Sequence, residues 1–204
     1  MAQARKVANP LGLAVLAYLT QRPMHPYELG RTLRDNGDAR SIKFNHGSLY
    51  TVVGQLQRAG YVEEAGTSRS GQRPERTVYA ITDAGRREVD GWIRELLAEP
   101  QHEYPAFTAA LSLVAVLPPA DVLPLLRRRL DLLAAQRTAI RELVDTALAQ
   151  GVPALFLLEE EHRLALLDAE VAFVERLCDR IADPQEDWAR QWTSHREEAP
   201  PDER

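Results

Sequence analysis

The sequence predicts a mainly α-helical protein with a small β-hairpin in its N-terminal half. Two patterns lead to this prediction. Apolar residues recur every three or four positions through most of the 204 residues, which is the period of amphipathic helices. Between two of these segments, a polar and basic turn at residues 68–76 is followed by the alternating stretch 77–81, which is typical of paired strands.

Four helices are expected in the first half of the chain, at residues 10–20, 26–36, 45–60 and 83–98. A proline stands at the start of each of the first two, where its fixed backbone angle suits a first helical turn. Asn45 and Thr82 are good N-cap residues for the other two, and Gly37 and Gly60 stand at helix ends. The end signals therefore agree with the apolar spacing.

The third helix has an apolar face formed by Leu49, Val52, Val53 and Leu56, at positions i, i+3, i+4 and i+7. A helix followed by a strand, a basic hairpin tip and a second strand is the order of a DNA recognition helix and its wing. The sequence therefore predicts a winged helix-turn-helix domain over residues 9–98 that binds duplex DNA.

The face opposite this apolar stripe is expected to contact DNA. Gln55 suits the edge of an adenine, and Thr51 suits a thymine methyl group. The hydroxyls of Ser48 and Tyr50 suit backbone phosphates. The predicted DNA-binding residues are Lys43 and His46 beside the helix N-terminus, Ser48, Tyr50, Thr51, Gln55 and Arg58 on the helix, and Arg69, Arg73 and Arg76 on the wing.

The charge distribution agrees with this interpretation. Residues 1–93 hold 13 of the 25 Lys and Arg and 9 of the 30 Asp and Glu, a net charge of +4. The remaining 12 and 21 give residues 94–204 a net charge of −9. Phosphate attracts the first half and repels the second. A solvated acidic helical domain would have the same asymmetry.

The second half is predicted to be an α-helical dimerisation domain at residues 99–184, followed by a charged tail at 185–204 that is expected to be partly disordered. Helices are expected at 104–117, 121–150 and 154–182. The last has apolar residues at alternating steps of three and four, which is a heptad seam. The predicted dimer interface is Leu157, Leu164, Leu167, Val171, Val174, Cys178 and Ile181.

Five short segments carry a further pattern: Leu13–Leu16, Pro23–Leu29, Gly47–Tyr50, Leu56–Val62 and Tyr79–Gly85. In combination they resemble the PadR family of transcriptional regulators, over about residues 9–97. The length and helical pattern of the remainder are similar to the longer PadR subfamily. The resemblance implies a winged helix-turn-helix, a homodimer formed by C-terminal helices, and repression relieved by a small effector such as a phenolic acid. One departure is Pro26, where the family usually has glycine.

An effector pocket is expected near the junction of the two domains, where ligand pockets tend to form. Aromatic side chains on the helices flanking the junction are the candidates for its wall. They are Trp92, Tyr104, Phe107, Phe156 and Phe173. Ordinary core packing is the alternative for each of them taken singly.

No catalytic, cofactor or metal site is predicted. The five histidines are scattered, and the acidic run ending at His162 is better explained as a solvated helix face. Cys178, the single cysteine, lies in an apolar stripe and is expected to be a buried structural thiol. With neither a leader nor a membrane span evident, the protein is expected to act in the cytoplasm.

The sequence thus favours a sequence-specific DNA-binding regulator, a homodimer that recognises an inverted repeat in duplex DNA and responds to a small aromatic effector. One alternative is a protein-interaction module, in which the winged helix docks a protein partner and the wing arginines are merely solvated. An enzyme is the remaining alternative, and the lack of a catalytic constellation disfavours it.

Overall fold

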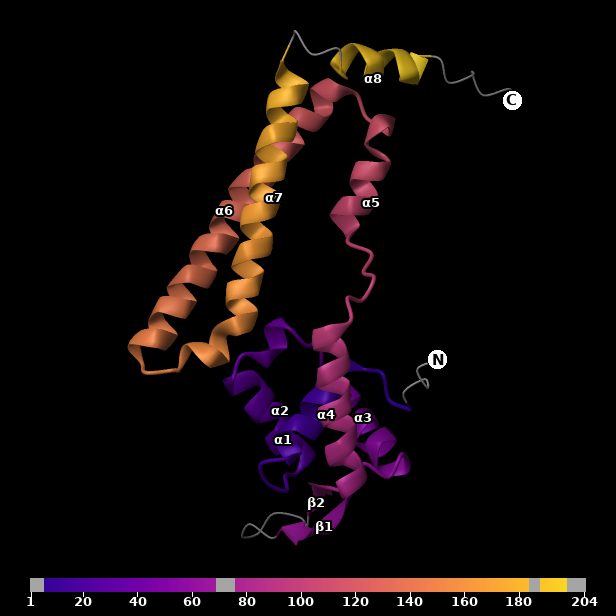
Figure 1. Cartoon of the computed structure of the whole chain (residues 1–204), viewed down its shortest axis with the longest axis vertical. Helices are drawn as coiled ribbons and strands as arrows, with labels where there is room; N and C mark the ends of the chain where they lie inside the picture. Colours follow the sequence, from indigo (N-terminus) through magenta and orange to yellow (C-terminus); the bar gives the residue numbers. More distant parts are fainter. Residues whose placement is uncertain (1–5, 69–75, 184–187, 198–204) are drawn as a thin grey trace, which may run out of the picture. The chain divides into compact units, whose positions relative to one another are not determined.

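The computed structural model describes residues 6–68, 76–183 and 188–197. The chain divides into two compact units, Met1–His102 and Glu103–Arg204. Each unit has its own cluster of buried apolar side chains. The first unit contains both helices and a two-stranded sheet, whereas the described part of the second is helical (Figure 1).

The first unit begins with two helices and a short 3-10 turn, which lead into a third helix. Its elements are α1 (Pro10–Leu19), α2 (Pro26–Asp35), η1 (Asp38–Arg40), α3 (His46–Arg58), β1 (Val62–Ser68), β2 (Arg76–Ile81) and α4 (Asp83–Ala98). The N-terminal helices and strands expected from the sequence are confirmed, with boundaries that differ by one or two residues. The order is that of a winged helix-turn-helix.

Side-chain caps fix where these helices start. The Asn9 Oδ1 atom accepts a hydrogen bond from the Leu11 backbone N–H at 2.9 Å, and Thr82 Oγ1 accepts one from the Gly85 N–H at 3.1 Å. His25 caps α2 in the same way, with Nδ1 accepting from the Tyr27 N–H at 3.0 Å. Pro26 follows this cap as the first helical residue, a position that needs no backbone donor.

The core of this unit holds α1, α2 and α3 together. The apolar stripe of α3 is fully covered, because Leu49 and Leu56 are 0% exposed and Val53 is 2% exposed. Val52 of α3 is a further buried member, and the rest come from other segments: Val7, Leu11, Ala14, Val15, Leu16, Leu19, Met24, Leu29, Leu33, Val62, Ile81 and Val89. The spacing that predicted the stripe therefore identified the buried face of α3 correctly.

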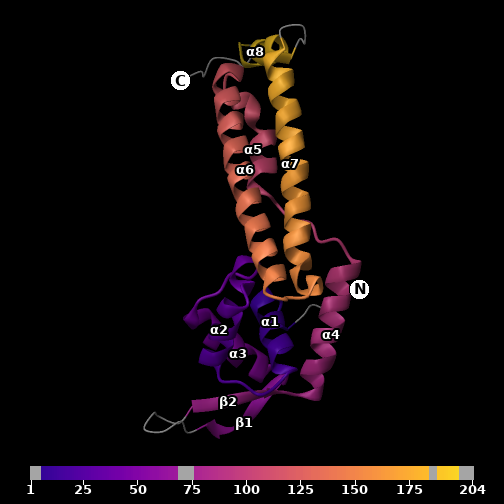
Figure 2. The same ribbon diagram turned by 90° about the vertical axis from the view of Figure 1, so that its left-hand side faces the viewer.

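The wing is an antiparallel hairpin whose register begins with Val62 opposite Ile81. The register shifts between Glu64 and Gly66, where Gly66 has a φ of 129°. This angle lies in the region that favours glycine, so Gly66 permits the irregularity. Figure 2 shows β1 and β2 side by side, extending beyond α1 to α3.

Backbone hydrogen bonds attach the wing to the rest of the unit. Met24 and Tyr79 each donate a backbone N–H to the other's carbonyl oxygen, both at 3.0 Å. The segment between α1 and α2 therefore pairs with β2 as a one-residue bridge. Because the pairing lies three residues after the start of β2, the hairpin leaves the unit in a fixed direction.

The second unit contains the antiparallel helices α6 and α7, which lie side by side in both views (Figures 1 and 2). Its elements are α5 (Ala106–Ser112), η2 (Val114–Val116), α6 (Pro119–Ala149), η3 (Ala154–Leu157), α7 (Leu158–Ala182) and α8 (Trp188–Glu197). The segment expected to form one helix at 104–117 is instead divided into α5 and η2.

The buried cluster of the second unit lies toward the C-terminal end of α7. Val122 and Leu126 of α6 pack there with Val174, Cys178 and Ile181 of α7. Trp192 of α8 packs against the same cluster, and the Arg180 guanidinium lies 3.9 Å from the centroid of the Trp188 ring. The range 185–204, expected to be a partly disordered tail, therefore includes a helix held by its tryptophans.

Candidate nucleic-acid interface

Helix α3 buries one face and presents a polar face. Its sequence contains no acidic residue, and Arg58 is the basic residue of its last turn. Among the predicted contacts, Thr51, Gln55 and Arg58 are exposed, and Tyr50 is 50% exposed. Lys43, in the segment before α3, is also exposed. The structure therefore places these five side chains at the surface, as a DNA-binding role requires.

Ser48 caps α3, a role that the sequence did not assign to it. Its Oγ accepts from the Asn45 N–H at 2.8 Å, while the Ser48 N–H donates to Asn45 Oδ1 at 2.8 Å. The pair is a capping box that satisfies both backbone donors. The Ser48 hydroxyl also donates to the Asn45 carbonyl at 2.9 Å. The Ser48 hydroxyl proton is thus engaged within the helix cap, and a phosphate contact of Ser48 stays a prediction.

The Thr51 hydroxyl donates to the Gly47 carbonyl one turn earlier, at 3.0 Å. This local bond occupies the hydroxyl. The methyl group of Thr51 is then the part of the side chain that suits an apolar contact. The arrangement agrees with the expected thymine methyl contact, which stays a prediction.

Aromatic and imidazole rings pack in pairs at the edge of this face. The Tyr27 and His46 rings are stacked, with centroids 6.0 Å apart and planes at 9°. His25 meets Tyr50 edge to face, with centroids 6.2 Å apart. These pairs connect the start of α2 to the first turns of α3, and so they orient His46 and Tyr50.

Arg34 and Tyr27 are surface residues of α2 that the sequence did not assign to DNA binding. The Arg34 Nη1 atom lies 3.5 Å from His46 Nε2, and Tyr27 is 50% exposed. Both therefore belong to the polar surface around the N-terminus of α3. The apolar spacing of α2 predicts only which face of the helix is buried. Which of its exposed residues lie beside α3 depends on how the two helices pack, and the local sequence does not predict this.

The wing supplies a second part of the candidate interface. Arg69 and Arg73 lie outside the described residues, and Arg76 is the first residue of β2. Next to α3, the wing root forms a hollow of about 280 Å³ lined by residues of α2, α3 and β2: His25, Pro26, Tyr50, Val53, Gly54, Thr77 and Tyr79. Burial raises the pKa of the Tyr79 phenol.

Of the five aromatic residues expected to line an effector pocket, Trp92 belongs to the first unit and the other four belong to the second. Phe107 and Phe173 meet edge to face with centroids 6.5 Å apart. Tyr104 and Phe156 are exposed by 89% and 66%, whereas Trp92 is buried in the first unit. Sequence alone did not identify Arg129, whose guanidinium lies 3.5 Å from the Phe107 centroid and pairs with Glu170 at 2.5 Å.

The predicted dimer seam is partly used within one chain. Val174, Cys178 and Ile181 pack against α6 and are at most 9% exposed. Burial raises the pKa of the Cys178 thiol, which suits a structural residue. The other four members, Leu157, Leu164, Leu167 and Val171, are half-buried. Heptad spacing correctly predicts that α7 packs against a helix, but the helix it meets here is α6.

Within the described residues, no group of three or more His, Cys, Asp or Glu is placed to hold a metal ion. A search of the same residues for a helix long and apolar enough to cross a membrane finds none.

Comparison with known proteins identifies the first unit. Residues 15–91 match the sequence model of the "Transcriptional regulator PadR-like family". These residues belong to the PadR-like family. The matched range includes most of the winged helix-turn-helix, from α1 to the middle of α4. No curated protein matches the chain at the sequence level.

Several solved structures resemble both the first unit and the helices that follow it. PadR of Bacillus subtilis in complex with operator DNA is 17% identical with a TM-score of 0.70, over 85% of this chain and 99% of that one. The complex of B. subtilis PadR with p-coumaric acid is 16% identical with a TM-score of 0.69, over 85% of this chain and 99% of that one. The Vibrio cholerae virulence activator AphA is 18% identical with a TM-score of 0.62, over 84% and 97%. At these identities the likeness establishes the fold.

Proposed function

We propose that this PadR-like protein is a homodimeric transcriptional repressor that binds an inverted repeat in duplex DNA through α3 and the wing. It has no catalytic role, and it acts in the cytoplasm, where chromosomal DNA is accessible. The observation that carries the proposal is the surface of α3. A helix whose apolar stripe is buried presents a polar face without a single carboxylate, and Arg76 begins the second strand of the hairpin that follows it.

The described acidic residues of the first unit lie on segments other than α3, and two of them, Glu28 and Glu64, are bonded to neighbouring side chains. Glu63 and Glu64 lie on β1, and the Gln57 amide donates to Glu64 Oε1 at 3.1 Å. The Arg22 guanidinium pairs with Glu28 at 2.5 Å and lowers the pKa of that carboxyl. Repulsion of phosphate is therefore reduced where α3 would approach DNA. B. subtilis PadR, which has the same fold, has been solved with operator DNA.

A second copy of the chain is the partner that best explains the surface of α7. Leu158, Leu166 and Phe173 are exposed by 54%, 58% and 40%, and their spacing of eight and seven residues puts them on one face. This stripe lies away from the residues that pack on α6. Two-fold pairing of such stripes would bury them, and it would present two α3 helices to successive major grooves.

A small aromatic carboxylate is the effector class that we propose. Arg129 offers a guanidinium that already faces both an aromatic ring and a carboxylate, and Phe173 adds a second ring. An aromatic acid would present the same two groups to it. The p-coumaric acid in the solved complex of B. subtilis PadR belongs to this class of ligand. Titration of benzoate-type acids into the DNA complex tests the effector, with release of DNA as the expected result.

Selection from a random duplex pool tests the DNA-binding function. The full-length chain should enrich one sequence, organised as an inverted repeat, and should bind it as two chains per duplex. Half-site centres should be separated by about 10 base pairs or a multiple of that turn. A chain that enriches no sequence and shows no salt-dependent binding would instead support docking to a protein partner.

A further inference from the structure

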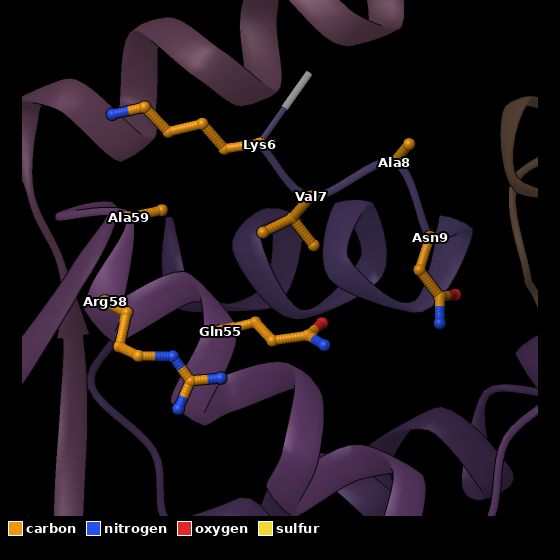
Figure 3. Close-up of a pocket in the computed structure, with 7 residues that line it drawn as sticks. All are labelled: Lys6, Val7, Ala8, Asn9, Gln55, Arg58 and Ala59. Carbon is orange, nitrogen blue, oxygen red and sulfur yellow. The ribbon is translucent and has the colours of Figure 1, made fainter. Parts of the chain in front are cut away.

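We propose that the N-terminal segment Lys6–Asn9 is part of the DNA-binding surface, and that Lys6 and Arg58 bind successive phosphates of one DNA strand. The inference rests on the proposed function and extends it to a segment outside the helix-turn-helix and the wing. Its basis is a hollow of about 480 Å³ between this segment and the C-terminal end of α3 (Figure 3).

The segment is fixed to the unit by two of its own residues. Val7 is 6% exposed and belongs to the core cluster, in which its Cγ1 atom packs closely on Gly12. Asn9 caps α1 through Oδ1, and its carbonyl accepts from the Gly12 N–H at 2.7 Å. With its Val7 and Asn9 positions held, Lys6 stays beside α3 instead of moving freely in solvent.

The side chains around the hollow are those that bind phosphate. The lining residues are Lys6, Val7, Ala8, Asn9, Gln55, Arg58 and Ala59. Two of them are cationic, two carry amide groups, and none is acidic. Cations and amide donors of this kind make the backbone contacts that position a protein on DNA. The Asn9 Oδ1 atom is occupied by its cap, so its NH₂ group is the part suited to a ligand.

The two cations suit two phosphates and not one. In Figure 3, the Lys6 ammonium and the Arg58 guanidinium lie on opposite sides of the hollow and point away from each other. The Lys6 Nζ atom is 6.0 Å from the centroid of the Tyr61 ring, which draws it to its own side. A DNA strand carries its charges at regular intervals, so two separated cations match two neighbouring phosphates.

The hollow adjoins the face of α3 that would enter the major groove. Gln55 and Arg58 belong both to that face and to the lining. A strand bordering the groove would therefore pass the segment directly after α3. The duplex is then contacted from three sides, by α3, by the wing and by Lys6–Asn9.

The salt dependence of binding tests this inference. Lys6→Ala and Arg58→Ala are each expected to lower the logarithmic salt slope by about 0.9 on a duplex enriched by the wild type, and the double variant by about twice that value. Base preference should be unchanged in Lys6→Ala. The control is Arg94→Ala, which removes the same charge from an exposed α4 residue paired with Asp90 at 2.8 Å.

Neutral methylphosphonate linkages locate the contacts. At one position in each half-site, a neutral linkage is expected to weaken binding of the wild type but not of Lys6→Ala. At a neighbouring position, a neutral linkage should weaken binding of the wild type but not of Arg58→Ala. If Lys6→Ala has the slope of Arg94→Ala and no such position exists, the N-terminal segment does not contact DNA, while the proposed function stands. If the wild type binds no duplex, both this inference and the proposed function are wrong.

Discussion

Gly85 and Gly91 lie on the same helix, and replacing each by alanine should change stability in opposite directions. An added Cβ at Gly85 would overlap the Tyr61 carbonyl oxygen, and it would lie 3.0 Å from the Tyr61 carbonyl carbon and 2.7 Å from Ile81 Cγ1. The first of these is backbone, which cannot rotate away. An added Cβ at Gly91 would meet nothing within 4 Å.

The magnitudes follow from these surroundings. Overpacking of a tight site costs about 1–3 kcal/mol, because backbone must shift to admit the methyl group. At an open helical position, alanine is more stable than glycine by about 0.5–1 kcal/mol. Gly85→Ala should therefore destabilise the first unit and Gly91→Ala should stabilise it. The expected difference between the variants is about 1.5–4 kcal/mol.

Trp92 provides the assay. Of the three tryptophans, Trp188 and Trp192 lie in the second unit. When both are replaced by phenylalanine, the remaining tryptophan fluorescence comes from Trp92 and reports on the first unit alone. Urea unfolding in that background gives the free energy of each glycine variant. Equal stability of the two alanine variants would refute the close approach of α4 to the Tyr61 carbonyl.

Three further predictions concern other parts of the chain. Burial, with the hydrogen bond to Asp38, raises the pKa of Tyr18 from 10.0 to about 12. The neutral phenol therefore stabilises the fold fully below pH 10, and this contribution is lost as the pH rises from 10 to 12. Urea unfolding of the wild type should show this loss of stability, and unfolding of Tyr18→Phe should not. Leu166→Asp should sediment as a monomer with unchanged helix content, whereas Thr138→Asp, an exposed position off the stripe, should stay dimeric. Arg129→Met should speed amide hydrogen exchange in α5, and Arg128→Met, at the exposed neighbouring position, should not; equal exchange in both would mean that the Arg129 contacts do not hold α5.

Local signals explain why much of the first unit was predictable. The spacing of Leu49, Val52, Val53 and Leu56 defines a single buried face, and the structure confirms it. Asn45 caps α3 because its side chain reaches backbone donors two or three residues ahead. Such features depend on residues close in sequence, so the helix limits and the inward face could be derived without the fold.

Other features depend on which segments meet, and spacing alone does not state this. The heptad pattern of α7 requires a helical partner, but it does not say whether that helix belongs to the same chain. The Ser48 hydroxyl suits both a phosphate contact and a helix cap, and only the position of Asn45 shows that it forms the cap. The position of Lys6 beside α3 depends on the burial of Val7. A single apolar residue before α1 forms no periodic pattern, so the sequence did not predict that burial.

The most direct test of the central claim compares two glutamines of α3. Gln55 and Gln57 are both exposed, but Gln55 belongs to the proposed DNA face, whereas the Gln57 amide donates to Glu64 at 3.1 Å. On the enriched duplex, Gln55→Ala should cost about 1–3 kcal/mol and remove discrimination at one base pair in each half-site. Gln57→Ala should bind as the wild type does. Equal affinities and base preferences for the two variants would contradict the claim that this face of α3 reads DNA.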